Sequence, residues 1–383
     1  GKTDFPLSGR LFNPARRRKK TINGESILLK GWLSPKVHTQ MKIWKKQWAN
    51  ELELINTEQL TPSGKMFIRT LKDLSSGNNF FMLKYLSYQR FFRKYPILTV
   101  SAIDENSPAT RCILDAAAAE GSKRIGIQHG NIGNAQPAYL YTPLDREAGV
   151  MADVTLVWGR YWRNFLVETG NFPPESITIT GQLRTDVIPA MLSQVERLKR
   201  HYGISGKVAL FASQPIPDPI QRRQAALDVF TAFKQLYDVE LFVKLHPAEH
   251  NDERYYRTLA TEAGLTEFRL FSGEDLYSLL CVSNLVITCY STVGTEAIYF
   301  NKPLIILDPQ REDLLGYHKA GVAEQAVNAL MLEQLSSQML SGELTIDQQT
   351  YHNFIENYAY RIDGKVTDRT LQAIYAAGND IHH

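Results

Sequence analysis

The chain has 383 residues, of which 44% are hydrophobic and 22% are charged, and its formal net charge is +3. This length exceeds one ordinary hydrophobic core and predicts two domains of about 150 to 200 residues each. The composition is typical of a globular protein in water, and the small net charge gives no indication of a nucleic-acid partner.

The cysteines indicate the compartment. Cys112, Cys281 and Cys289 follow no metal or disulfide spacing, which favours a reducing cytoplasm. No apolar run reaches the roughly 18 residues that span a bilayer, and the N-terminus lacks the apolar core of a signal peptide. We therefore expect a cytoplasmic protein.

One charge run stands out: "RRRKK", which begins at Arg16 and ends at Lys20. It is either a solvated loop or a surface that meets an anionic acceptor or anionic lipid at the inner face of the cytoplasmic membrane. Aromatic residues do not interleave with it, which disfavours single-stranded nucleic acid.

Residues 1–96 carry helical patterns rich in lysine and aromatic residues, and they predict a partly helical extension of the first domain. The sequence that follows alternates short apolar runs with helical patterns. The expected strands in this part are residues 97–104, 123–130, 154–159 and 176–181. A helix is expected over residues 107–121, with Ser107 as its N-cap and Gly121 as its end. Strands separated by helices predict a parallel sheet with right-handed crossovers.

A polar helical stretch, residues 186–202, leads into a second series of the same kind. Its expected strands are residues 208–213, 239–245, 268–271, 285–291 and 303–308. We therefore predict an α/β fold with two doubly wound, Rossmann-type domains that face a cleft. The predicted domains are residues 1–190 and 191–325, with helices in residues 326–381 that pack back on them.

Polar residues just after strands are candidate site residues, because ligands of open α/β sheets bind beyond the carboxyl ends of the strands. His246 and Pro247 follow the strand 239–245, and the proline ends the hydrogen-bond ladder because it lacks an N–H. The next helix offers free N–H groups to a phosphate, and His246 can donate a hydrogen bond to a phosphate oxygen. The alternative is that His246 only caps the strand.

A second strand end has the sequence "TCYSTVGTEAIYFNKPLIILD". Ser291 and Thr292 stand where the strand turns into a helix, and their hydroxyls can cap that helix or bind a phosphate or ribose. Gly294 permits a close approach of helix and strand or of a ligand. Plain N-capping is the alternative, but two such strand ends in one half of the chain favour a nucleotide site.

The segments "VKLHP" and "SNLVITCYSTVGTEAIYFNKPLIIL" resemble the His-Pro and Ser/Thr motifs of bacterial GT-B glycosyltransferases. More narrowly, they are similar to enzymes that use CMP-activated acidic sugars, the bacterial sialyltransferases and the β-Kdo transferases of capsule and lipopolysaccharide assembly. The stretch "ASQP", which contains Gln214, is similar to a glutamine motif of the β-Kdo group. The resemblance covers residues 97–308 and makes 1–190 the acceptor-side domain and 191–325 the nucleotide-sugar-binding domain. It implies that four residues contact the CMP: His246, Pro247, Ser291 and Thr292.

Strand ends in the first half supply further candidates. Asp104 and Glu105 precede a helix start, so each either caps that helix or acts as a general base for an acceptor hydroxyl. His129 and Arg184 follow two other strands, and similar stretches in related transferases imply that they line the donor side of the cleft.

Charge neutralisation of the donor phosphate is assigned to cationic side chains. Lys244, His246 and Arg184 can provide it, together with helix N-termini. No Asp-x-Asp triplet occurs in the sequence. We therefore expect neither a metal ion nor a cofactor other than the sugar donor.

The resemblance implies transfer of Kdo from CMP-β-Kdo to an oligosaccharide or lipid-linked acceptor in O-antigen or capsule synthesis, with retention of configuration. His246 would stabilise the departing phosphate. Retention by double displacement needs a carboxylate nucleophile, and Asp218 is the first candidate, although it also has the pattern of a helix N-cap. Glu105 is the first candidate for the base, with Asp104 beside it.

Two alternatives remain. The first keeps the fold and the cytidine nucleotide but changes the donor, as in a sialyltransferase or a CDP-glycerol glycerophosphotransferase. The second is a non-catalytic module that scaffolds polysaccharide assembly. The two nucleotide-side motifs and the acidic cluster of the first half disfavour this second alternative.

Overall fold

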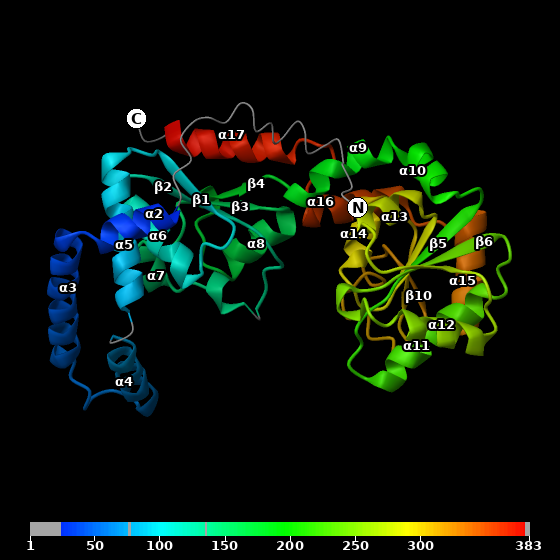
Figure 1. The fold of residues 1–383 in the computed structure, drawn as a ribbon, viewed down its shortest axis with the longest axis horizontal. Helices are drawn as coiled ribbons and strands as arrows, with labels where there is room; N and C mark the ends of the chain where they lie inside the picture. Colours follow the sequence, from blue (N-terminus) through cyan, green and yellow to red (C-terminus); the bar gives the residue numbers. More distant parts are fainter. Residues whose placement is uncertain (1–23, 76–77, 135, 380–383) are drawn as a thin grey trace. The chain divides into compact units, whose positions relative to one another are not determined.

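The computed structural model describes residues 24–75, 78–134 and 136–379 (Figure 1). The basic run that ends at Lys20 lies outside these residues. The chain divides into two compact units. Unit 1 comprises residues 1–131, 141–155 and 374–383, and unit 2 comprises residues 132–140 and 156–373. The domain limits expected after residues 190 and 325 stay predictions.

Unit 1 begins with helices. They are α2 (Gly24–Trp32), α3 (Pro35–Leu54), α4 (Pro62–Ser75) and α5 (Asn79–Lys94). Helix α2 lies directly against α5, since a Cβ atom added at Gly31 would stand 1.7 Å from Ser87 Oγ. On α5, Phe92 packs on Ala116 and Ala117 of α6 (Pro108–Ala118). Within the part of the chain described, the stretch before the first sheet is therefore helical, as predicted from its patterns.

The first sheet has four strands in the order β1-β2-β3-β4. They are β1 (Thr99–Ala102), β2 (Lys123–Ile127), β3 (Val154–Val157) and β4 (Ile177–Ile179). Strands β1 and β2 pair in parallel. The order follows the sequence without a reversal among the described strands. This sheet therefore lacks the double winding that we predicted for it.

The second sheet lies in unit 2 and has the order β10-β9-β8-β5-β6-β7, with parallel pairing throughout. Its strands are β5 (Lys207–Ala212), β6 (Val239–Lys244), β7 (Arg269–Phe271), β8 (Leu285–Thr288), β9 (Leu304–Leu307) and β10 (Glu324–Ala326). The order reverses between β5 and β8. This sheet is doubly wound, as predicted, and its reversal point is where ligands of such sheets bind.

Helices cover both faces of the second sheet. They are α9 (Ile188–Leu192), α10 (Val195–Tyr202), α11 (Pro219–Phe233), α12 (Glu253–Ala263), α13 (Leu276–Val282), α14 (Val293–Tyr299), α15 (Ala329–Ser341) and α16 (Gln348–Tyr358). Side chains of β5 alternate between two hydrophobic cores. Val208 and Leu210 face the core with α13 and α14, whereas Ala209 and Phe211 face the core with α11, α12 and α15. Two cores on one sheet hold the strand ends rigidly in place.

The remaining elements are short or lie at the C-terminus. They are α7 (Pro143–Glu147), α8 (Arg160–Glu168), α17 (Val366–Asn379) and the 3-10 helices η2 (Pro137–Tyr139), η3 (Pro174–Ser176), η4 (Leu183–Val187) and η5 (Pro247–Glu249). Asp186 caps α17, because its carboxylate accepts hydrogen bonds from the N–H groups of Val366 (2.6 Å) and Thr367 (3.0 Å). Among the described helices, none is both long and apolar enough to cross a bilayer.

Candidate functional site

Gln214 joins the two strand ends at the reversal point of the second sheet. Its side-chain oxygen accepts hydrogen bonds from the backbone N–H groups of Cys289 (3.1 Å) and Tyr290 (2.8 Å). The loop after β5 is thereby fastened to the loop after β8. Both lone pairs of that oxygen are used, so only the amide NH2 of Gln214 is left to meet the predicted nucleotide.

His246 follows β6 and caps the 3-10 helix η5. Its Nδ1 accepts a hydrogen bond from the backbone N–H of Ala248 at 3.1 Å. A neutral imidazole has one donor and one acceptor nitrogen, so the proton lies on Nε2. His246 thus caps η5, whereas the structural alternative placed it as a cap of the strand. Its exposed side chain also retains an N–H that can be donated to a ligand.

The ammonium group of Lys244 is held by the protein itself. It donates hydrogen bonds to the backbone carbonyls of Leu245 (2.9 Å) and Ser272 (3.0 Å). Burial lowers the pKa of Lys244. Because an ammonium group has three N–H donors, the predicted contact with a donor phosphate would use the third.

A buried polar network lies beneath the His246 turn, and the sequence analysis missed it. Glu249 is only 2% exposed. Its carboxylate accepts hydrogen bonds from the Ser213 hydroxyl (2.6 Å) and the Tyr256 hydroxyl (3.0 Å). Arg222 of α11 completes the set with an ion pair of 2.6 Å to Glu249. The Ser213 oxygen also accepts the backbone N–H of His246 at 3.0 Å. In the sequence, the feature that could have indicated this network is the acidic residue Glu249, three residues after His246.

The second predicted strand end is organised by Tyr317. A Cβ atom added at Gly294 would stand 2.6 Å from Cε2 of this ring, so the glycine permits the close approach of Tyr317. The Tyr317 hydroxyl donates to the backbone carbonyl of Ser291 at 3.1 Å. Ser291 Oγ accepts the N–H of Val293 at 3.2 Å. Thr292 is exposed and its side chain makes no capping hydrogen bond, so its hydroxyl is not committed to the helix.

Arg184, Glu296 and Tyr277 form a compact group in unit 2. The guanidinium of Arg184 lies 3.0 Å from Glu296 Oε1 and stacks 5.8 Å from the ring centre of Tyr277. The Tyr277 hydroxyl donates to the same carboxylate oxygen at 3.3 Å. Burial raises the pKa of Glu296, and Arg184 partly offsets this effect. Arg184 was predicted as a site residue, whereas its two partners were not.

Asp218 is an ordinary N-cap in the structure. Its Oδ1 accepts the backbone N–H groups of Ile220 (2.8 Å) and Gln221 (3.4 Å) at the start of α11. This is the alternative that the sequence pattern left open for Asp218.

Glu105 lies in the turn after β1 in unit 1 and is buried, whereas Asp104 and His129 are exposed. Gly126 makes room for Glu105, because a Cβ atom there would stand 2.6 Å from Glu105 Oε1. Oε2 of Glu105 has no hydrogen-bond partner within the part of the chain described. Burial raises the pKa of Glu105, and the nearby His129 counteracts part of that rise.

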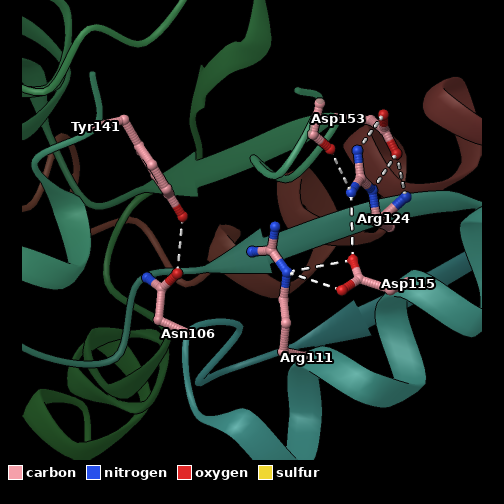
Figure 2. Close-up of polar contacts among 7 residues, drawn as sticks. Asn106, Arg111, Asp115, Arg124, Tyr141 and Asp153 are labelled. Atoms are coloured by element: carbon pink, nitrogen blue, oxygen red, sulfur yellow. Dashed lines mark hydrogen bonds and ion pairs between the residues drawn. The ribbon is translucent and has the colours of Figure 1, made fainter. Parts of the chain in front are cut away.

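Polar contacts connect the helix after β1 with β2 and the loop before β3 (Figure 2). Arg124 of β2 forms an ion pair of 3.2 Å with Asp153 and one of 3.5 Å with Asp115 of α6. Arg111 of α6 approaches the same Asp115 carboxylate at 3.2 Å. These ion pairs anchor α6 and therefore the strand end that carries Asp104 and Glu105.

The sequence predicted that the protein uses no metal ion. In the ranges 24–75, 78–134 and 136–379, no group of three or more His, Cys, Asp or Glu side chains could hold a metal ion. The metal-free reaction stays a prediction, as do the predicted ligand contacts of the site residues.

Comparison with solved structures supports the fold. A UDP-GlcNAc 2-epimerase from Neisseria meningitidis, in a structure bound to UDP-GlcNAc, is 15% identical, with a TM-score of 0.54 over 76% of this chain and 81% of that one. A UDP-N-acetylglucosamine 2-epimerase from Listeria monocytogenes is 17% identical, with a TM-score of 0.52 over 77% of this chain and 79% of that one. These likenesses confirm the predicted α/β class with parallel sheets of the GT-B type.

The family is shown by the sequence itself. The family described as CDP-Glycerol:Poly(glycerophosphate) glycerophosphotransferase matches residues 123–375. This is more than half of the chain, and the chain belongs to that family. No curated protein matches the sequence.

The predicted transfer of Kdo from CMP-β-Kdo is therefore wrong, since the family match supports the CDP-glycerol alternative. The His-Pro and Ser/Thr segments led to this error because both belong to the second, doubly wound sheet, which enzymes with different donors share. They carry no information on the transferred group. Retention of configuration was expected only because of the Kdo donor, and the nucleophilic role of Asp218 was expected only because of retention. Neither expectation is kept.

Proposed function

We propose that this protein transfers glycerol phosphate, or a similar alditol phosphate, from its cytidine diphosphate-activated form to a hydroxyl group of a surface-polymer acceptor. The observation that supports this activity is the family match over residues 123–375, which includes both His129 and His246.

The reaction sets three tasks. The acceptor hydroxyl oxygen forms a bond to the phosphorus that carries the glycerol, while the bond from this phosphorus to the bridging diphosphate oxygen breaks. CMP leaves with the bonding electrons, and the hydroxyl proton goes to a base. The protein must bind the nucleotide, stabilise the charge that develops on CMP and accept the proton. No anomeric carbon reacts, so no carboxylate nucleophile is needed.

The donor side of the reaction fits the strand ends of unit 2. His246 offers its Nε2–H, because Nδ1 is engaged with Ala248. This N–H can donate a hydrogen bond to an oxygen of the diphosphate. That hydrogen bond strengthens as negative charge develops on the departing CMP. The uncommitted hydroxyl of Thr292 and the exposed guanidinium of Arg184 are further donors of the same unit.

The acceptor side is assigned to unit 1, where His129 is our first candidate for the base. Its imidazole is exposed, and histidine is the commonest general base in enzymes. Glu105 is a weaker candidate than the sequence suggested, because it is buried. Its carboxylate is better suited to support the charge of His129 once the proton has been transferred. Asp104 remains an exposed alternative base.

The place of action is also part of the proposal. The acceptor is a saccharide or alditol polymer carried on a lipid, at the inner face of the cytoplasmic membrane. The basic run that ends at Lys20 is suited to that surface by its charge.

A thermal-shift series with CMP, CDP, UDP and GDP tests the donor, followed by CMP release from CDP-glycerol with an added acceptor. We expect the two cytidine nucleotides to raise the unfolding temperature more than UDP or GDP does. Stabilisation by UDP alone would contradict the proposal. Stabilisation by CMP without CMP release from any CDP-alditol would favour the non-catalytic module.

A further inference from the structure

A pocket with a volume of about 390 Å³ lies in unit 2, beyond the carboxyl ends of β8 and β9. Its lining includes Tyr290, which follows β8, Asp308, which follows β9, and Gln221 in the first turn of α11. The pocket is therefore on the side of the sheet on which doubly wound folds bind their ligands. None of its lining residues was among the site residues predicted from the sequence.

The pocket adjoins the strand end that carries Thr292, one of the proposed donors to the diphosphate. Tyr290 lines the pocket and directly precedes Ser291, and its backbone N–H donates to Gln214 at 2.8 Å. Tyr317 also lines the pocket, and its hydroxyl donates to the backbone carbonyl of Ser291 at 3.1 Å. A group that is attached to the diphosphate, or one that attacks it, is thus placed to enter the pocket.

The charge of the lining disfavours the phosphates themselves. The described residues that line the pocket include three carboxylates, Asp308, Glu312 and Asp313, and no lysine, arginine or histidine. Carboxylates repel a phosphate group. The part of a substrate that fits this pocket is therefore one without negative charge.

The loop after β9, which forms one wall of the pocket, is held in a strained conformation. Arg311 and Asp313 have positive φ angles of 58° and 45°, which residues other than glycine rarely adopt. Asp308 Oδ2 accepts the N–H of Asp313 and the side-chain amide of Gln325, both at 2.8 Å. Asp313 Oδ2 accepts the N–H of Lys319 at 2.7 Å. These hydrogen bonds use two of the three carboxylates to fix the loop, so they preform the pocket and leave it poorly suited to a cation.

The other groups of the pocket suit hydroxyl groups. Gln221, Tyr290 and Glu312 have exposed side chains that end in an amide, a phenol and a carboxylate, all of which exchange hydrogen bonds with alcohols. The apolar part of the lining can contact C–H groups and includes Ile216, Ile220, Leu314 and Leu315. The volume corresponds to roughly a dozen water molecules, so the pocket admits a pentitol as well as glycerol.

We propose that this pocket binds the neutral alditol group of a substrate and thereby selects which alditols the protein accepts. The proposal rests on the proposed transfer of an alditol phosphate. The alditol belongs either to the cytidine diphosphate-activated donor or to the end of the acceptor, since both present the same chain of hydroxyl groups. Gln221 and Glu312 bind these hydroxyls, and Ile216 contacts the carbon chain.

Calorimetric binding of CMP, CDP-glycerol and CDP-ribitol to the full chain tests the proposal, together with the KM of an alditol-phosphate oligomer as acceptor. If the pocket holds the alditol of the donor, Gln221→Ala/Glu312→Ala should bind CDP-ribitol about tenfold more weakly, because two hydrogen bonds are lost, and CMP as the parent does. Ile216→Trp, which fills the pocket, should weaken CDP-ribitol more than CDP-glycerol. If the pocket holds the end of the acceptor, both variants should bind the donors normally and raise the KM of the oligomer about tenfold.

The matched control is Gln348→Ala/Glu343→Ala, which removes an exposed glutamine and an exposed glutamate of unit 2 outside the pocket lining. It should behave as the parent does, and circular dichroism should show that every variant is folded. The pocket proposal is wrong, although the proposed function stands, if the parent releases CMP and both pocket variants keep the parental donor affinities and the parental acceptor KM.

Failure of the proposed function has a different signature, because the parent would then neither bind CMP nor release it from a CDP-alditol. In that case free ribitol is the probe, and its contact with the protein is measured by saturation-transfer NMR. A ribitol signal in the parent that is lost in Ile216→Trp and kept in the control would still support an alditol pocket. No ribitol signal in the parent would overturn it.

Discussion

Ser213 and Glu249 are joined by a 2.6 Å hydrogen bond, which fastens the end of β5 to the turn after β6. The same hydroxyl oxygen of Ser213 accepts the backbone N–H of His246 at 3.0 Å. The position of the histidine thus depends on a buried carboxylate that does not contact its imidazole. Glu249 is in turn held by Tyr256 and Arg222, so helices α11 and α12 both help to place His246.

We predict that Ser213→Ala disturbs this arrangement without unfolding the protein. The change leaves Glu249 Oε2 without its hydroxyl donor and the His246 N–H without its acceptor, which should cost about 1–3 kcal/mol of unfolding free energy. Turnover should fall about tenfold, with a smaller effect on the KM of the donor, because the histidine shifts within the site. Urea unfolding and steady-state kinetics measure both effects.

The matched control for this prediction is Ser336→Ala. Ser336 is fully buried, and its hydroxyl has no hydrogen-bond partner within the described ranges. Its removal should leave turnover unchanged and should not lower stability, because no hydrogen bond is lost. If Ser213→Ala behaves like this control, Ser213 does not position His246.

Substitutions at His246 should distinguish the capping role of Nδ1 from the proposed donor role of Nε2–H. His246→Asn can still accept the Ala248 N–H but lacks the Nε2 proton, so it should fold normally and slow transfer about 10²-fold, as His246→Ala should. His246→Gln can bring an amide N–H toward the Nε2 position and should recover part of the rate. Single-turnover CMP release compares these variants.

His250→Asn is the control at the same turn, since His250 lies four residues away and is exposed. It should work at the parental rate. A folded His246→Asn variant that also works at the parental rate would reduce His246 to a structural cap.

Gly294→Ala should destabilise the protein through a steric overlap with Tyr317. The new methyl group would stand 2.6 Å and 3.0 Å from two ring atoms, which should cost about 1–3 kcal/mol. Tyr317→Leu in the same chain should make the glycine substitution less harmful, since coupled residues are not additive. Gly133→Ala is the control, because no atom lies within 4 Å of a Cβ added there. Equal unfolding temperatures for the two single variants would refute the overlap.

Glu105 should make the stability depend on pH. Burial raises its pKa in the folded protein above the usual value for Glu. The folded state therefore holds its proton to higher pH than the unfolded state does, and stability falls as pH rises from the usual value through the raised one. Glu105→Gln should lack this loss. Between pH 4 and pH 8, the stability of the variant should therefore rise relative to that of the parent. Thermal unfolding at the two pH values checks the sign. If the variant shows the parental pH dependence, the raised pKa is refuted.

Removal of divalent metal should leave the protein active. The sequence contains no Asp-x-Asp triplet, and the proposed donor contacts are His246, Thr292 and Arg184. CMP-induced stabilisation and CMP release should therefore persist in EDTA. Loss of both in EDTA, with recovery on addition of Mg²⁺ or Mn²⁺, would show that a metal ion takes part in donor binding and transfer.

Local sequence patterns determined much of the fold. Strands such as β5, β6 and β8 appear as short apolar runs, and Ser107 with the following proline marks the start of α6, because caps and buried strands use interactions within a few residues. His246 and Thr292 were predicted as site residues by the same reasoning, and the structure shows that both follow strands, β6 and β8. The nature of the donor could not be found in this way, because the strand-end motifs on which the donor was predicted led to Kdo, whereas the family match supports CDP-glycerol.

Only the tertiary structure decided the partnerships between distant residues. Gln214 meets the N–H groups of Cys289 and Tyr290 because the strand order places β5 beside β8, although about 75 residues separate them. The pairing of Arg184 with Glu296 and the filling of the space at Gly294 by Tyr317 arise likewise from chain crossings that no local pattern encodes. Sequence periodicity reports which side of an element is buried, whereas the identity of the neighbour depends on how the whole chain packs.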